Sequence, residues 1–122
     1  SCTYLVAHNI EFDKTMIDVE CFRHKFRKKL SECRKIEYCT MKKGIKICNI
    51  MKINPYTKKK EPKWPKLIEL HKVLFNTDPK NLHNALIDIL VCFRCFYKMV
   101  YDFDPKETNV KFNQCYEMYC GL

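Results

Sequence analysis

The stretch that decides the fold class is TYLVAHNIEFD, residues 3–13. Residues 3–7 are β-branched or apolar, which is typical of a short buried strand. His8 and Asn9 end that run, and Asn9 is a good N-cap for a helix whose first turns carry acidic residues. The sequence therefore predicts a strand, a sharp turn and a helix in direct succession.

Hydrophobic periodicity extends this pattern along the chain. It predicts a first helix from Ile10 to about Leu30 and a second strand at residues 36–41. Further helices are expected at residues 45–53, 64–75 and about 84–101, with a solvated loop or flap at 54–62 and a polar tail at 109–122. The predicted class is α/β, mostly helical, with two parallel strands. Two strands do not make a stable sheet, so either partner strands come from other sequence or the molecule is helical with a small ribbon.

Charge is the main compositional signal. The 122 residues hold 23 Lys and Arg against 14 Asp and Glu, a formal net charge of +9. This favours a polyanionic partner such as nucleic acid, although an A/T-rich coding sequence explains the lysines equally well. Lys42, Lys43 and the run at 58–60 are candidate phosphate contacts, with a solvated face as the competing interpretation. No apolar run approaches the roughly 20 residues of a membrane span, so no membrane partner is expected.

Cysteine usage bears on the compartment and on metal binding. The count of nine is odd and no secretory signal is visible, so we expect reduced thiols in an intracellular protein, cytoplasmic or nuclear, that is not secreted. Cys92-x-x-Cys95, with Cys115 and Cys120, leaves open a zinc-binding regulatory domain. The first pair lies in a strongly apolar stretch, however, where cysteine behaves as a small hydrophobe.

Two aspartates stand in apolar surroundings. Asp88 interrupts the run LIDILV, residues 86–91, and a buried carboxylate needs a compensating partner. An exposed stripe or a lysine partner is the alternative. His83 would point about 140° away from Asp88 on one continuous helix, but both can face one cleft if His83 lies in a turn before the helix. Asp13 follows the first strand, at the end where parallel α/β folds bind ligands.

These segments resemble one family. VAHNIEFD, residues 6–13, is similar to the second motif of the DnaQ-like 3′–5′ exonucleases, and HNALID, residues 83–88, matches the third motif, His-x-Ala-x-x-Asp, of the DEDDh subgroup. Residues 39–41 and 64–67 also look like this family, particularly its versions in large DNA viruses. The resemblance covers residues 3–101 and implies a ribonuclease H-like fold.

One departure from the family concerns its first motif. Asp-x-Glu on an earlier strand should precede the second motif by several dozen residues, and only seven residues precede His8. Residues 1–122 are therefore expected to be the carboxyl-terminal two-thirds of a single exonuclease domain, truncated at the amino end. Asp18 and Glu20 are poor substitutes for the missing motif because they lie within the predicted helix.

The resemblance implies a hydrolytic mechanism. Two Mg²⁺ or Mn²⁺ ions, held by four carboxylates, would promote removal of nucleotides from a 3′ end. Asp13 and Asp88 correspond to the second and third carboxylates, and His83 to the general base that takes a proton from the attacking water. His8 and Asn9 fit the motif as substrate contacts, although roles at the strand end and the helix cap are favoured for them.

The implied partners are nucleic acids. Single-stranded DNA or RNA 3′ ends would be the substrate, a polymerase would be the partner of a proofreading domain, and the missing amino-terminal part of the domain would complete the metal site. The alternative is a noncatalytic single-stranded nucleic-acid-binding module or scaffold. Tyr56 and Trp64 are candidates for stacking on bases, with packing favoured for Trp64, and His24 and His71 are expected at the surface.

Overall fold

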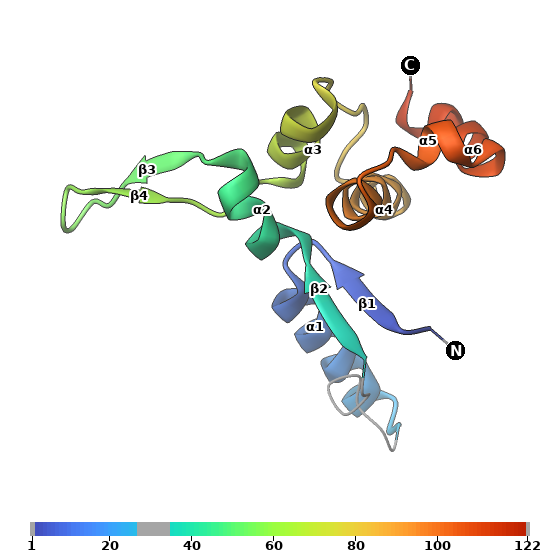
Figure 1. Cartoon of the computed structure of the whole chain (residues 1–122). Coiled ribbons are helices and arrows are strands. Elements are labelled where there is room, and N and C mark those ends of the chain that lie inside the picture. The colour runs from blue at the N-terminus through green and yellow to red at the C-terminus, as the bar shows by residue number, and fades with distance from the viewer. Residues whose placement is uncertain (1, 27–34, 122) are drawn as a thin grey trace.

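The computed structural model describes residues 2–26 and 35–121. The elements, in chain order (Figure 1), are β1 (Tyr4–Ala7), α1 (Ile10–Arg23), β2 (Ile36–Cys39), α2 (Thr40–Cys48), β3 (Met51–Ile53), β4 (Lys60–Pro62), α3 (Leu67–Phe75), α4 (Ala85–Tyr101), α5 (Pro105–Thr108) and α6 (Val110–Cys120). The predicted α/β class with a mostly helical content is confirmed at this level. Within the described ranges, none of the helices has both the length and the apolar character needed to cross a membrane.

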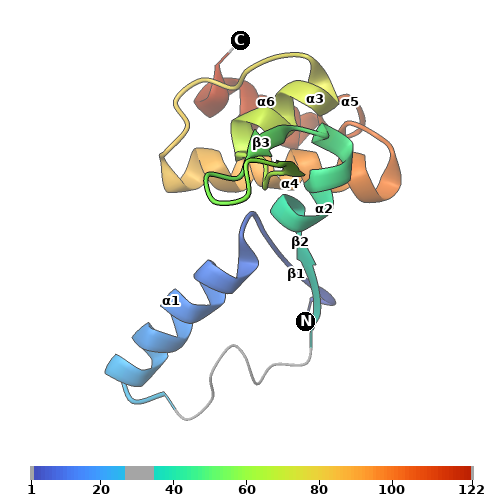
Figure 2. The same ribbon diagram turned by 90° about the vertical axis from the view of Figure 1, so that its left-hand side faces the viewer.

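The first two strands form the predicted parallel pair. Tyr4 lies opposite Ile36 and Ala7 opposite Cys39, and α1 connects the strands. Figures 1 and 2 show this ribbon and α1 on one side of the molecule, with helices α3 to α6 on the other. The ribbon is attached through aromatic contacts, because the ring of Phe96 on α4 lies 5.9 Å from that of Tyr4 and 5.1 Å, edge-on, from that of Tyr38.

Helices α3, α4 and α6 share one core. Its fully buried members include Leu70 and Val91. His71 was predicted at the surface, and that prediction is wrong: its side chain is 1% exposed. Its Nε2 lies 2.8 Å from the hydroxyl of Tyr116 and 3.0 Å from Nη1 of Arg94. Arginine can only donate, so Nε2 accepts and Nδ1–H donates to a carbonyl.

The segment after β2 differs most from the sequence prediction. The strand ends at Cys39 instead of residue 41, and the predicted helix at 45–53 divides into the second half of α2 and the strand β3. Asn49 ends α2 in the left-handed conformation. The predicted loop at 54–62 includes β4, which pairs antiparallel with β3 to form a hairpin. These strands were missed because three residues are too few to distinguish an alternating pattern from a helical one, and because Lys and Pro in the second strand are not typical of strands.

Three other boundaries also differ. The predicted polar tail contains α6, which Asn109 caps by accepting a hydrogen bond from the backbone N–H of Phe112. Helix α3 begins at Leu67, so Trp64 precedes it and is 59% exposed where packing was favoured. Helix α1 ends at Arg23, and the part of the prediction that falls on residues 27–30 lies outside the described residues.

The apolar side of α1 is largely exposed. Ile10 is its buried residue, whereas Phe12 and Phe22 are 60% and 79% exposed. Helical periodicity predicted this apolar stripe, but within the described part of the chain α1 makes only small contacts, chiefly with β1 and β2. Periodicity identifies a face able to be buried and does not identify what buries it.

Candidate functional site

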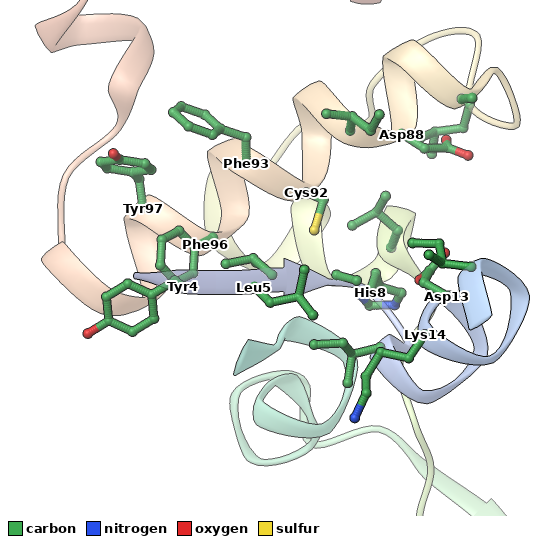
Figure 3. Close-up of a pocket in the computed structure, with 18 of the residues that line it drawn as sticks. Tyr4, Leu5, His8, Asp13, Lys14, Asp88, Cys92, Phe93, Phe96 and Tyr97 are labelled. Atoms are coloured by element: carbon green, nitrogen blue, oxygen red, sulfur yellow. The ribbon is translucent and has the colours of Figure 1, made fainter. Parts of the chain in front are cut away.

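A pocket lies between β1, the start of α1, the start of α3 and one side of α4 along its length (Figure 3). Its two ends differ in chemistry. One end is apolar and aromatic, with Tyr4, Phe96 and Tyr97 among its lining residues, while the other holds His8, Asp13, His83 and Asp88. Figure 3 shows Asp13, Asp88 and His8 at this second end, which we call the acidic end. Motifs that are distant in sequence therefore line the same pocket.

Asp13 reaches the acidic end because α1 starts directly after β1. Asn9 turns the chain through a left-handed conformation, φ 73°, and its carbonyl accepts the backbone N–H groups of Phe12 and Asp13. Burial raises the pKa of Asp13, and the nearby His8 opposes that shift. A carboxylate whose charge is disfavoured in this way gains from a cation placed beside it.

Asp88 and His83 come to the same end through the start of α4. Asn84 caps this helix, since its Oδ1 accepts from the backbone N–H groups of Leu86 and Ile87 at 3.0 and 3.4 Å. His83 lies in the preceding turn with φ 81°, and its backbone N–H donates to Oδ1 of Asp88 over 3.1 Å. His83 and Asp88 can line one pocket because His83 lies in the turn before α4 and not in the helix itself.

His8 has a structural role in this geometry. Its Nε2–H donates to the carbonyl of Pro65 over 2.9 Å, and its Nδ1 lies 2.9 Å from the hydroxyl of Thr40. Burial lowers the pKa of His8, which favours a neutral ring with Nδ1 as acceptor. Both ring nitrogens of His8 therefore form hydrogen bonds within the chain, and neither is free to contact a substrate. This agrees with the structural role that the sequence favoured for His8 at the end of the strand.

Asn9 holds the N-cap position without capping. Its side chain makes no cap hydrogen bond, and it does not line the pocket. The prediction of a capping side chain is therefore wrong. Asparagine is suited to the position because its short polar side chain tolerates the left-handed conformation better than most residues do.

The predicted lysine contacts are not part of the pocket. Lys42 and Lys43 are exposed on α2, and Nζ of Lys43 lies 6.0 Å from the centroid of the Tyr38 ring. The pocket is lined instead by Lys14, which forms an ion pair with Glu37 at 2.6 Å, and by Lys66. The sequence analysis did not identify Lys14 or Lys66 as pocket residues. Lys66 had a signal, because it stands in the segment 64–67 that resembles the family.

The acidic end fits part of a site for a hard divalent cation. Two carboxylates, Asp13 and Asp88, line it, and oxygen is the ligand that Mg²⁺ and Mn²⁺ prefer. Within the described residues, however, no three His, Cys, Asp or Glu side chains are placed to hold one ion. Glu20 lies on α1 outside the pocket, in an ion pair with Arg23 at 2.8 Å, and Asp18 also lies outside it. The described chain thus offers a partial ligand set.

The cysteine pair considered for zinc has unsuitable surroundings. Cys92 and Cys95 lie on α4 and are buried. Burial raises the pKa of Cys92 to about 11 and that of Cys95 further. Zinc binds the thiolate, so burial works against binding at this pair, whose thiols pack as small apolar groups.

Comparisons with protein-family models, with curated proteins and with solved structures found no match to this chain.

Proposed function

We propose that this chain carries part of the active centre of a metal-dependent 3′–5′ exonuclease with a ribonuclease H-like fold. One observation supports the proposal above the others: Asp13, from one motif, lines the same pocket as His83 and Asp88, from the other. The same three residues are those that the resemblance to the DnaQ-like family selects.

The roles follow from the chemistry of each side chain. Asp13 and Asp88 supply hard oxygen ligands at the acidic end of the pocket. Bound Mg²⁺ or Mn²⁺ supplies charge stabilisation at the scissile phosphate and acidifies water. His83 accepts a proton from the attacking water, a task suited to imidazole near neutral pH. Its backbone N–H holds one oxygen of Asp88 in place.

Two carboxylates do not complete a two-metal site. The proposal therefore requires further carboxylates, which we assign to an Asp-x-Glu motif of the family's kind outside the described residues. Activity is accordingly a property of the protein that contains that motif, and it is tested there.

The experiment uses the full-length protein that the gene encodes. Single-stranded DNA and RNA labelled at the 5′ end are incubated with Mg²⁺, Mn²⁺ or EDTA. We expect metal-dependent shortening from the 3′ end with release of mononucleotides, reduced by at least about 100-fold in Asp13→Asn, Asp88→Asn and His83→Gln. Asp102→Asn, at the opposite end of α4 with a side chain that is 94% exposed, is the matched control and should retain activity. Undiminished release by Asp88→Asn would overturn the proposal.

A second candidate is a noncatalytic module that binds single-stranded nucleic acid. The incomplete ligand set of the described residues and the net charge of +9 favour it. It predicts binding in EDTA that weakens with salt, and no cleavage in Mg²⁺ or Mn²⁺. Turnover that depends on Asp88 would exclude it.

A further inference from the structure

The β3–β4 hairpin extends from the body of the protein beyond α2, with its loop at the outer end (Figure 1). Three residue pairs join its strands, from Met51 with Pro62 to Ile53 with Lys60. No part of the acidic end of the pocket comes from this hairpin. Its role is therefore separate from the proposed chemistry.

The hairpin and the segment that follows it are rich in lysine. The segment 51–66 holds six Lys and one Glu. Glu61 lies 3.6 Å from Lys52, and Lys63 pairs with Glu69 at 3.0 Å. The run Lys58 to Lys60 is exposed and forms no ion pair within the described ranges. Three adjacent uncompensated ammonium groups at the outer end of an extended hairpin produce a local positive potential that attracts phosphates.

Exposed aromatic rings accompany the lysines. Tyr56, in the loop, is 93% exposed, and Trp64, after β4, is 59% exposed. The loop is held by Asn54, whose Oδ1 accepts from the N–H groups of Tyr56 and Thr57 at 2.8 and 3.3 Å, while its carbonyl accepts from the N–H of Lys58 at 2.8 Å. The loop thus presents Tyr56 outward from an ordered backbone. An aromatic ring beside unpaired cations is the combination on which single-stranded nucleic acids bind.

The hairpin is also close to the pocket along the chain. Strand β4 ends at Pro62, and Lys66, four residues later, lines the pocket. Four residues span at most about 14 Å. A strand whose 3′ end lies in the pocket would therefore reach the base of the hairpin within a few nucleotides, and the loop lies farther out (Figure 1).

We propose that the β3–β4 hairpin is an arm that binds the single-stranded substrate behind its 3′ end, with Lys58, Lys59 and Lys60 on the phosphates and Tyr56 stacked on a base. The proposal rests on the proposed function in that the substrate is nucleic acid. It does not depend on Asp13, His83 or Asp88, and the contacts require no particular base sequence.

The test measures binding without turnover. Fluorescence anisotropy of labelled single strands is recorded in EDTA across 50–200 mM salt, about the range over which phosphate contacts are resolved. The triple variant Lys58→Gln, Lys59→Gln, Lys60→Gln should bind at least about 10-fold more weakly, with a salt slope smaller by about 2, because each lost contact on a single strand removes about 0.7. Tyr56→Ala should weaken binding roughly 5-fold or more at an unchanged salt slope, and Tyr56→Phe should bind as the parent does.

A matched control separates the arm from net charge. Lys72, Lys80 and Lys111 are exposed and lie outside the hairpin, so their triple replacement by Gln removes the same charge elsewhere and should leave most of the affinity. Equal weakening by both triple variants would overturn the proposal, as would unchanged binding by the hairpin variant. A preference for duplex DNA, or binding of polyglutamate that matches that of nucleic acid, would also overturn it.

The two proposals fail separately. Hairpin-dependent binding without any metal-dependent cleavage would support the proposed binding arm and reject the exonuclease proposal. Cleavage that depends on Asp88, together with binding that the hairpin substitutions do not change, would reject the binding arm and support the exonuclease proposal. Circular dichroism of each variant verifies that the helical content is retained.

Discussion

The backbone N–H of His83 donates a hydrogen bond to Oδ1 of Asp88 across 3.1 Å. This bond closes the turn that precedes α4, in which His83 has φ 81°. A non-glycine residue in this region carries a backbone cost. The turn holds that conformation at the place where two proposed catalytic residues must face one pocket.

Substitution of His83 tests whether its conformation is strained. We expect His83→Gly to be more stable than His83→Ala by about 1 kcal/mol in the free energy of unfolding, because glycine adopts a positive φ without a Cβ penalty. Urea unfolding of both variants measures the difference. Neither variant retains the imidazole, so both should lack exonuclease activity. If His83→Ala were more stable to urea than His83→Gly, the backbone of residue 83 would not be strained.

The Arg94–Asp104 pair is expected to stabilise the helical core. Nε and Nη2 of Arg94 donate to the two oxygens of Asp104 at 2.9 and 2.6 Å, and both side chains are largely buried. Arg94→Met should lower the free energy of unfolding by about 3–5 kcal/mol, because a buried carboxylate loses its partner. Adding Asp104→Asn, which keeps an acceptor for the cap of α5, should recover part of that loss. Urea unfolding in a double-mutant cycle measures the coupling, and additive losses would show that the pair contributes nothing.

Stability should fall as the solution is acidified below about pH 6.5. Burial lowers the pKa of His71 and of His8 from the ordinary value of 6.5. The unfolded chain therefore binds these protons at higher pH than the folded protein does, so lowering the pH favours unfolding, by up to about 1.4 kcal/mol per pH unit for each histidine. Urea unfolding between pH 8 and 5 measures the slope, which His71→Gln and His8→Gln should each reduce. A stability that rises on acidification would contradict the assignment of neutral buried rings.

Gly44→Ala should destabilise the protein although Gly44 lies within helix α2. A Cβ at this position would lie 3.1 Å from Cδ1 of Leu70 and 3.2 Å from Cγ of Pro65. Leu70 is fully buried and has little room to move, so overpacking of about 1–3 kcal/mol should exceed the helix-propensity gain of about 1 kcal/mol. Thermal unfolding measures the net effect. In a Leu70→Ala background the clash is relieved, and Gly44→Ala should become stabilising.

The thiol of Cys92 should be unreactive in the folded protein. Burial raises its pKa to about 11, whereas Cys2 is exposed. Because the thiolate is the nucleophile, iodoacetamide at pH 8 should label Cys2 quickly and Cys92 only after unfolding. Mass spectrometry of digests taken with and without urea measures both rates. Equal labelling in the folded protein would contradict the burial of this side chain.

Local patterns predicted the parts of the fold that local forces decide. The strand at residues 3–7 and the helix that follows it depend on neighbouring residues, and the structure has them close to where the sequence indicated. His71 was misplaced because the partners that compensate its burial, Thr77, Tyr116 and Arg94, come mostly from other elements. The β3–β4 hairpin was missed because three-residue strands have no readable period.

The sequence by itself determined the order of strand, turn and helix, and the two motifs that contain Asp13, His83 and Asp88. Only the tertiary structure decided that these side chains line one pocket. It also decided that both ring nitrogens of His8 form hydrogen bonds at the end of β1. The physical reason is range. Secondary structure follows from the conformational preferences of residues a few positions apart, whereas the placement of Asp13 and Asp88 on one pocket depends on packing between surfaces that no local pattern encodes.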